Sequence, residues 1–252
     1  MHPSSIPTNR LYSDLAWLWP LVSEREEYAE ESDCWRSLLR QHVGSGRHHL
    51  LELGVGGGHN LSFLTGEFDA TAVDLSAAML AHSQQLNPSV EHIVGDMRTV
   101  RLQRKFAAVL IHDAIGYMHT EDDLLATFAT AAAHLEPGGL LLMSPDYFRD
   151  TFVSPQVYHV TRRNADCELT YVEYVYDPDP ADTSVDIIMT LFIRRTEGLE
   201  IEHDRHVLSL FSRSDWLRLL AKSGFHAREQ TFQLTLANQH YSILVATLLP
   251  KR

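Results

Sequence analysis

The 252-residue sequence contains little cysteine, no strongly basic segment and no long apolar run, and each absence narrows the range of functions. Its two cysteines, Cys34 and Cys167, are far apart and do not form the cysteine framework of a small secreted protein. Acidic residues outnumber basic ones by 33 to 21, which gives a formal net charge of −12. Because such a chain repels phosphate backbones, we expect no nucleic-acid partner.

Membrane and export signals are also missing. No run reaches the roughly 18 apolar residues that span a bilayer. Residues 1–7 lack the basic and apolar regions of a signal peptide. We therefore expect a cytoplasmic protein with no membrane partner. Hydrophobic residues still make up 44% of the chain, enough for the core of an ordinary globular protein.

Between residues 45 and 150, short apolar runs alternate with helical segments. Strands that are apolar throughout and alternate with helices predict a parallel sheet covered on both faces. The predicted strands are 49–54, 70–75, 90–94, 106–112 and 140–144. The predicted helices are 60–66, 76–86 and 120–135, with Ser76 and Thr120 as N-caps and a turn at Pro137-Gly138-Gly139.

The flanking segments have other patterns. Residues 1–44 carry aromatic residues at near-helical spacing and predict a helical lid over the 45–150 core. Residues 151–210 contain period-2 segments and predict an inserted antiparallel meander, whose apolar face we expect to join two copies in a homodimer. Residues 211–252 predict a helix capped by Ser214 and two further strands. The predicted fold is a doubly wound, Rossmann-like, seven-stranded α/β sheet with a β insertion and a helical lid.

A glycine-rich loop, Gly54-Val55-Gly56-Gly57-Gly58, joins the first predicted strand to the first predicted helix. Glycines there let a ligand lie against bare backbone, beside the free N–H groups of a helix start. A dinucleotide fingerprint needs a third glycine where this chain has His59. Glu52 precedes the loop, and a carboxylate suits a cationic ligand better than a pyrophosphate. The pattern resembles motif I of class I methyltransferases that bind S-adenosylmethionine (SAM); an NAD site and a tight turn without ligand are the alternatives.

Two acidic residues follow the next predicted strands. Asp74 ends the second strand, where a carboxylate can accept both ribose hydroxyls; its alternative role as a helix cap suits Ser76 better. Met79 could touch the adenine, although core packing is an equal alternative. In the methyltransferases that the loop resembles, the residue at Asp96 binds the adenine amino group and the residue at Met97 packs on the ring.

The fourth predicted strand ends in His112 and Asp113, at the edge where open α/β sheets bind ligands. Either side chain could orient a nucleophile or take its proton. The alternative is that both only line the cofactor pocket.

Four further segments sharpen the resemblance: Gly95-Asp96-Met97-Arg98, Arg104-Lys105-Phe106, Gly116-Tyr117 and His134-Leu135-Glu136-Pro137-Gly138-Gly139. Together they are similar to the methyltransferases that dimethylate amino sugars in macrolide biosynthesis, with glycine N-methyltransferase as a more distant relative. The similarity covers residues 45–148 and extends weakly to the last helix.

This resemblance implies a SAM-dependent enzyme with an N-terminal tyrosine, here Tyr12, over the active site. Asp146, where the sugar enzymes tend to be aromatic, and the pair His112-Asp113 depart from the family pattern. The identity of the methyl acceptor is therefore not carried over.

The predicted site follows from these observations. The candidates for residues around the acceptor are Tyr12, His112, Asp113 and Asp146. The candidates for cofactor binding are Tyr12, Tyr28, Glu52, Gly54, Gly56, Gly58, Asn60, Asp74, Leu75, Met79, Asp96, Met97 and His112.

The fifteen histidines do not indicate a metal site. His48 and His49 are adjacent, and His203 and His206 are three apart in a predicted strand, so each pair points to opposite faces. An acidic wall around the acceptor favours a cationic amine, hence SAM-dependent N-methylation of a small molecule. O- or C-methylation of a small polar metabolite, and a SAM-binding regulatory protein without turnover, remain alternatives.

Overall fold

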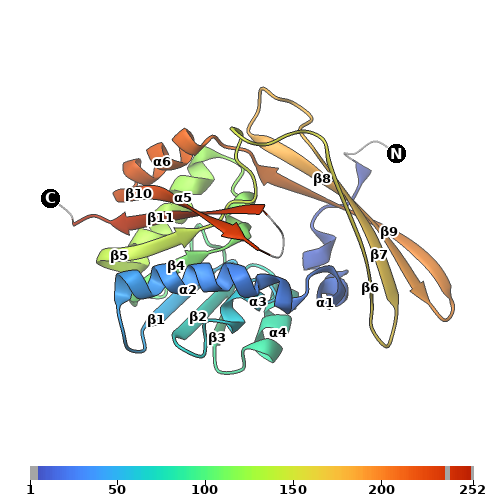
Figure 1. The fold of residues 1–252 in the computed structure, drawn as a ribbon, viewed down its shortest axis with the longest axis horizontal. Coiled ribbons are helices and arrows are strands. Elements are labelled where there is room, and N and C mark those ends of the chain that lie inside the picture. Colours follow the sequence, from blue (N-terminus) through green and yellow to red (C-terminus); the bar gives the residue numbers. More distant parts are fainter. Residues whose placement is uncertain (1–4, 236–238, 251–252) are drawn as a thin grey trace.

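The computed structural model describes residues 5–235 and 239–250; residues 1–4 of the predicted lid lie outside the described residues. The chain forms a mixed α/β core and a separate antiparallel sheet, with the N-terminal segment between them (Figure 1). The core sheet has seven strands in the order β10-β11-β5-β4-β1-β2-β3. Only β11 runs antiparallel to its neighbours β5 and β10. The predicted fold class is confirmed.

The core strands are β1 (His49–Leu53), β2 (Asp69–Asp74), β3 (Glu91–Val94), β4 (Phe106–Ile111), β5 (Leu135–Met143), β10 (Phe225–Leu234) and β11 (Gln239–Leu248). The second sheet contains β6 (Gln156–Arg163), β7 (Glu168–Tyr176), β8 (Ser184–Arg195) and β9 (Gly198–Ser209) in sequence order. The helices are α1 (Trp19–Val22), α2 (Ala29–Val43), α3 (His59–Ser62), α4 (Ala77–Leu86), α5 (Glu121–His134) and α6 (Arg213–Lys222). Short 3-10 helices are η2 (Arg10–Tyr12), η3 (Ala16–Leu18), η4 (Arg25–Tyr28) and η5 (Asp113–Tyr117).

The central strands are apolar throughout because helices cover both faces of the sheet. Leu51 of β1 packs in a cluster with Phe128 of α5 and Trp216 of α6. Leu50, on the opposite face, packs in a cluster with Trp35 of α2. All five side chains are fully buried, and each leucine contributes about 1.5–3 kcal/mol by leaving water.

Two of the three predicted helix caps are confirmed. The Ser76 hydroxyl accepts the Met79 amide, and the Thr120 hydroxyl accepts the Asp123 amide. The prediction of Ser214 as the cap of α6 is wrong. Ser212 caps this helix, because its hydroxyl accepts the amide of Asp215 while donating to the Asp215 carboxylate.

Two predicted features of the core, a helix end and a turn, also differ from the structure. The helix expected over 60–66 ends at Ser62, where the Ser62 and Thr65 hydroxyls bond to nearby main-chain carbonyls and compete with helical hydrogen bonding. The turn expected at Pro137-Gly138-Gly139 is an irregularity inside β5. There, Phe106 pairs with Leu135 but Ala108 pairs with Leu140, so the extra residues bulge out.

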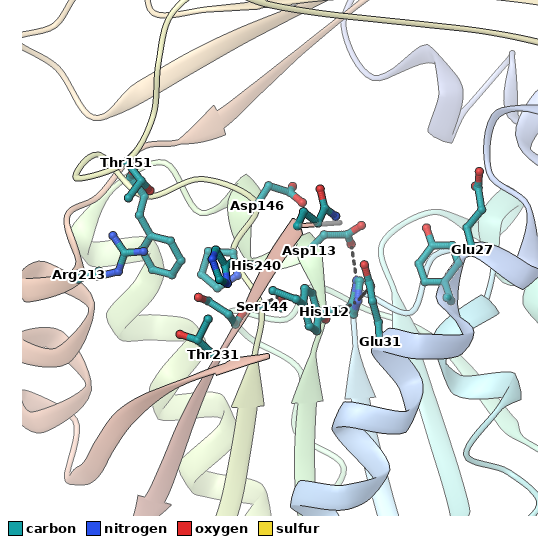
Figure 2. Close-up of a pocket in the computed structure, with 16 residues that line it drawn as sticks. Glu27, Glu31, His112, Asp113, Ser144, Asp146, Thr151, Arg213, Thr231 and His240 are labelled. Atoms are coloured by element: carbon teal, nitrogen blue, oxygen red, sulfur yellow. Dashed lines mark hydrogen bonds and ion pairs between the residues drawn. The ribbon is translucent and has the colours of Figure 1, made fainter. Parts of the chain in front are cut away.

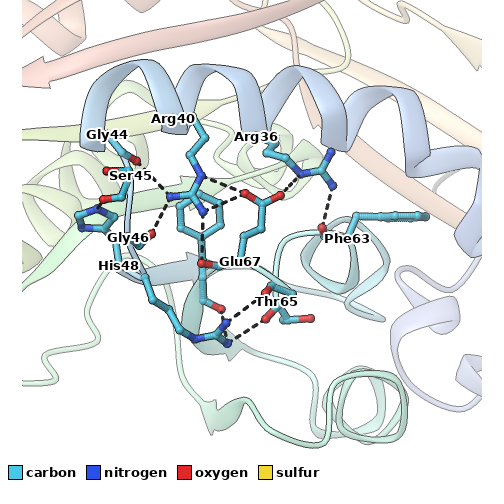
Figure 3. A network of polar contacts seen from close by, with 12 residues as sticks. Arg36, Arg40, Gly44, Ser45, Gly46, His48, Phe63, Thr65 and Glu67 are labelled. Carbon is cyan, nitrogen blue, oxygen red and sulfur yellow. Dashed lines mark hydrogen bonds and ion pairs between the residues drawn. The ribbon is translucent and has the colours of Figure 1, made fainter.

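A network of arginines fixes α2 against the connection between α3 and β2 (Figure 3). Glu67 lies between Arg36 and Arg40 of α2, at 3.0 and 2.8 Å from their guanidinium nitrogens. Arg40 also donates to the carbonyl of Gly46, and Arg36 to that of Phe63. The network sets the position of α2, which carries Glu31 toward the sheet edge.

The N-terminal segment is attached to the inner face of the second sheet. Its leucines, Leu11 and Leu15, pack in one cluster with Leu169 and Leu191 of the sheet. Arg162 of β6 donates to the carbonyls of Leu21 and Val22. The role of this segment as a lid stays a prediction.

The outer face of the second sheet exposes Val157, Tyr174 and Ile201. The homodimer through this face stays a prediction. Within residues 5–235 and 239–250, no helix combines the length and apolar character needed to cross a bilayer.

Candidate active site

The loop after β1 is shaped by glycines with left-handed backbone. Gly54, Gly56 and Gly58 have φ angles of 76°, 55° and 77°. The Gly54 amide donates to the Val73 carbonyl at 2.7 Å, which holds the loop over the end of β2. A Cβ on Gly54 would lie 2.4 Å from the Cβ of Ala114, so this position has no room for a side chain.

Asp74, at the end of β2, organises the same loop. Its Oδ2 accepts the Gly56 amide at 2.7 Å, and its Oδ1 accepts the Ser76 amide at 2.8 Å. Each carboxylate oxygen keeps capacity for another donor, such as a ligand hydroxyl. Burial raises the pKa of Asp74 in spite of the two amides.

A cavity of about 540 Å³ lies over the loop. Every residue predicted to bind the cofactor lines it: Tyr12, Tyr28, Glu52, Gly54, Gly56, Gly58, Asn60, Asp74, Leu75, Met79, Asp96, Met97 and His112. The structure brings these residues together, and their contact with a cofactor stays a prediction. Met79 is 1% exposed, so it packs in the core while forming part of the cavity wall.

Four aromatic residues of the same cavity are not among the predicted site residues: Trp19, His59, Tyr117 and His119. The Trp19 indole stacks on His59 and lies so close to Gly57 that a Cβ there would be 2.1 Å from Nε1. Trp19 belongs to the aromatic-rich N-terminal segment, but only the folded chain shows that it reaches the loop.

Three buried polar atoms of residues at this cavity have no partner among the described residues. They are Glu52 Oε2, which needs a donor, and Trp19 Nε1 and Asn60 Nδ2, which need acceptors. Burial raises the pKa of Glu52 to about 8. The amino-acid part of SAM carries an ammonium donor and a carboxylate acceptor, so the polar groups present fit SAM in their chemistry.

The Asp96 carboxylate, predicted to bind the adenine amino group, is already hydrogen-bonded to Arg98. Arg98 donates to both carboxylate oxygens of Asp96 and also to Asp123 at 2.7 Å. These bonds hold the pKa of Asp96 below its usual value. An adenine amino group would therefore share the Asp96 carboxylate with Arg98.

A second cavity, of about 750 Å³, shares Tyr28, His112 and Asp113 with the first. We call the first the glycine-loop cavity and the second the acceptor cavity. Asp146 lines only the acceptor cavity. Figure 2 shows Asp113 between Asp146 and His112, with Arg213 at one end of the cavity and Glu27 at the other.

His112 is enclosed by groups that favour its charged form. Its Nε2 lies 2.9 Å from Glu31 Oε2 and 3.0 Å from the Tyr241 hydroxyl, and its Nδ1 lies 3.5 Å from Asp113 Oδ1. Burial opposes the charge, but Tyr241, Asp113 and Glu31 together raise the pKa of His112 well above its usual value. An imidazolium has no free lone pair, which favours an orienting role for His112 over proton removal.

The pKa values of the two aspartates of the acceptor cavity are shifted in opposite directions. Burial disfavours ionisation of Asp113, but His112 beside it brings the pKa of Asp113 below its usual value. Desolvation, followed by the Asp113 charge, raises the pKa of Asp146 well above its usual value. The cavity thus presents a carboxylate whose charged form is favoured next to a carboxyl group whose protonated form is favoured.

Tyr12 lines the glycine-loop cavity, and the charges of Asp113 and Asp146 act on its phenol. Its hydroxyl accepts the Tyr117 hydroxyl at 3.0 Å, and its carbonyl accepts the Ser76 hydroxyl at 2.5 Å. Burial and the Asp113 charge raise the pKa of Tyr12, so the phenol stays neutral. The structure therefore brings together the four residues predicted around the acceptor, although their roles stay predictions.

Comparison with known proteins agrees with this geometry. The family described as "Methyltransferase domain" matches residues 50–139. A dTDP-3-amino-3,4,6-trideoxy-alpha-D-glucopyranose N,N-dimethyltransferase of Streptomyces venezuelae is 31% identical over 79% of this chain and 84% of its own length.

Solved structures agree with the sequence relatives. DesVI of Streptomyces venezuelae superposes with a TM-score of 0.79 at 26% identity, over 95% of this chain and 98% of its own. SAM-bound CalS10, an amino pentose methyltransferase from Micromonospora echinaspora, gives a TM-score of 0.72 at 25% identity, over 89% and 91%.

Proposed function

The chain belongs to the family of SAM-dependent methyltransferases that includes these sugar N,N-dimethyltransferases, and from this premise we propose that it methylates the amine of a small amino sugar. It is an enzyme that uses SAM to N-methylate a small molecule. The finer proposal is carried by one observation: an acidic cavity adjoins the glycine-loop cavity at Tyr28, His112 and Asp113.

In the glycine-loop cavity, each proposed contact matches a group of SAM. Asp74 accepts the ribose hydroxyls, Glu52 accepts the ammonium group and Trp19 donates to the carboxylate. When bound, SAM supplies a methyl group activated by its sulfonium. The N-terminal segment carrying Tyr12 and Trp19 keeps water away, and much of the acceleration comes from orientation.

In the acceptor cavity, charge selects an amine. The ionised carboxylate of Asp113 is 47% exposed and can hold an ammonium group. Asp146, whose pKa is raised, lines the same cavity and can hydrogen-bond to a sugar hydroxyl. A hydroxyl nucleophile would need a strong base, whereas the pKa of Asp113 is low and His112 is charged. This set of residues supports N-methylation over O-methylation.

A second candidate is an amino sugar attached to a nucleoside diphosphate, as in the names of the relatives. Arg213 supports it, because this residue lines the end of the acceptor cavity opposite Glu27 (Figure 2). However, Arg213 already pairs with Glu229 at 2.9 Å and lies 3.9 Å from Asp150. A diphosphate would have to compete with both carboxylates.

The test is transfer of an isotope-labelled methyl group from SAM to matched acceptors. We expect label on the nitrogen of D-glucosamine or of dTDP-3-amino-3,6-dideoxy-alpha-D-glucopyranose, and none on D-glucose. Turnover of only the dTDP-linked sugar would establish the second candidate. Label on oxygen, or no turnover of either amine, would overturn the proposal.

Asp113→Asn tests the charge selection directly. The variant removes the carboxylate that holds the ammonium group, so we expect KM for the amine to rise by about tenfold or more while SAM affinity changes little. Asp166→Asn, in the exposed turn before β7, is the matched control. Equal KM values in the two variants would contradict the role of Asp113.

A further inference from the structure

A line of hydrogen-bonded polar groups leads from Tyr12 into the second sheet. The Tyr117 hydroxyl donates to the Tyr12 hydroxyl at 3.0 Å and lies 2.7 Å from His206 Nδ1. His206 Nε2 lies 2.9 Å from Asp204 Oδ2. Asp204 and His206 are buried on the inner face of β9, at 0% and 3% exposure. The comparisons and the activity of the chain assign no role to these two residues.

Asp204 is the ionised group at the end of this line of hydrogen bonds. Its carboxylate accepts the main-chain amides of Arg10, Leu11 and Arg205 at 2.8–2.9 Å. Burial disfavours its charge, but His206 and the amides hold the pKa of Asp204 below its usual value. Because an ionised carboxylate only accepts hydrogen bonds, His206 Nε2 must carry a proton.

With that proton fixed, the remaining protons can be arranged in two ways. In the first, His206 is neutral, Tyr117 donates to Nδ1, and the bond between the two tyrosines runs from Tyr12 to Tyr117, the reverse of its direction in the structure. The Tyr12 oxygen then faces the cavity only as an acceptor. In the second, Nδ1 carries a proton and donates to Tyr117, Tyr117 donates to Tyr12, and the Tyr12 hydroxyl donates to the cavity. The two arrangements differ by one proton at His206.

We propose that Tyr12, Tyr117 and His206 form a proton relay that removes the proton from the acceptor ammonium group, with Asp204 as the counter-charge. The proposal rests on the proposed function, because only an amine acceptor brings an ammonium group to Tyr12.

The step balances as three proton shifts. The N–H bond of the ammonium breaks as its proton joins the Tyr12 oxygen. The former Tyr12 proton joins the Tyr117 oxygen, and the Tyr117 proton joins His206 Nδ1. The amine keeps the electron pair of the broken bond, which becomes the lone pair that attacks the methyl group.

The surroundings of His206 suit a transient positive charge. Asp204 on its own strand and Glu173 on β7 are the carboxyls near it, with Tyr117 of η5 and Tyr12 of η2 on its other sides. His112 is a poorer proton acceptor, because Tyr241, Asp113 and Glu31 raise its pKa well above its usual value. His206 thus takes the proton-accepting role that the sequence suggested for His112 or Asp113.

The first test needs no acceptor. In 15N-histidine NMR of the SAM-loaded protein, the His206 signals are those lost in His206→Gln. We expect Nε2 to stay protonated from pH 6 to 9, and Tyr117→Phe to shift the Nδ1 signal, whereas Tyr176→Phe on β7 leaves it unchanged. A neutral His206 with its proton on Nδ1 would overturn the relay, because that nitrogen could not accept.

The second test uses turnover of D-glucosamine or the dTDP-linked amine. His206→Gln should lower kcat by about 100-fold at pH 7, with less effect on KM, and the loss should shrink as pH rises and free amine becomes abundant. His203→Gln is the matched control, since His203 lies on the outer face of the same strand. A loss equal at every pH, or equal in the two variants, would overturn the relay.

Failure of the two proposals would look different. If no amine is methylated, the proposed function fails, while NMR still reports the proton positions on His206. If the amine is methylated but the pH profile of His206→Gln matches that of the unaltered enzyme, only the relay fails.

Discussion

The two cavities are built in different ways. The glycine-loop cavity is formed largely by consecutive residues at the carboxyl ends of β1, β2 and β3, and each of these stretches is a short motif in the sequence. The acceptor cavity combines η4, α2, the end of β4, the segment after β5, α6, β10 and β11, which are far apart along the chain. The glycine-loop cavity is therefore defined largely by local sequence, and the acceptor cavity by how distant elements pack.

Asp204→Asn should have the largest effect, because it removes the charge that joins the second sheet to the N-terminal segment. We expect a loss of about 3–5 kcal/mol in the free energy of unfolding, as for a broken buried pair. Denaturant unfolding measures it, with Asp166→Asn as control.

The pH dependence of that loss follows from the lowered pKa of Asp204. The stabilisation is present above the ordinary aspartate pKa and disappears as pH falls through the lower folded-state pKa. The difference between Asp204→Asn and the unaltered protein should thus be constant from pH 5 to 8 and shrink below about pH 4. A difference that stays constant into acid would contradict the role of the charge.

Glu52→Gln, in the glycine-loop cavity, should change the free energy of unfolding in the opposite direction. The pKa of Glu52 is raised to about 8, so the folded protein binds its proton more tightly than the unfolded chain. Above the ordinary glutamate pKa this costs stability, increasingly so up to pH 8. We expect the variant to be about 2 kcal/mol more stable at pH 8.5 but to bind SAM at least tenfold more weakly. A variant that is less stable, or binds SAM normally, would contradict an unpaired Glu52 facing the ligand.

Glu67→Gln should have the smallest effect. It weakens two partly exposed ion pairs that hold α2, and we expect about 1 kcal/mol of destabilisation. KM for the acceptor should change more than the affinity for SAM, because α2 carries Glu31 of the acceptor cavity. Glu197→Gln, in the exposed turn before β9, is the control. A larger change in SAM affinity than in KM would contradict the assignment of α2 to the acceptor cavity.

The contrast between the cavities also explains what the sequence could predict. The capping serine Ser76 and the loop acid Asp74 act on residues a few positions away or on the adjoining loop, so their spacing shows their role. The cap of α6 was misplaced because Ser212 and Ser214 both precede a helical pattern, and only the bond to Asp215 distinguishes them.

Residues that act across the fold were harder to find. Trp19 reaches Gly57 and His206 reaches Tyr117 through contacts that no local pattern records. One signal was present: Asp204 and His206 alternate on the inward face of a strand, where polar residues need a partner. The sequence indicates Asp146 as a candidate residue. Its raised pKa depends on desolvation in the folded cavity and on the charge of Asp113 at the end of another strand.

Calorimetry with SAM on Asp74→Ala and Asp69→Ala tests the central claim most directly. Asp74 and Asp69 lie at opposite ends of β2, and only Asp74 faces the glycine-loop cavity. Loss of two ribose contacts should weaken SAM binding by about 100-fold in Asp74→Ala, while Asp69→Ala binds as the unaltered protein does. Equal SAM affinity in the two variants would contradict the placement of SAM over the glycine loop.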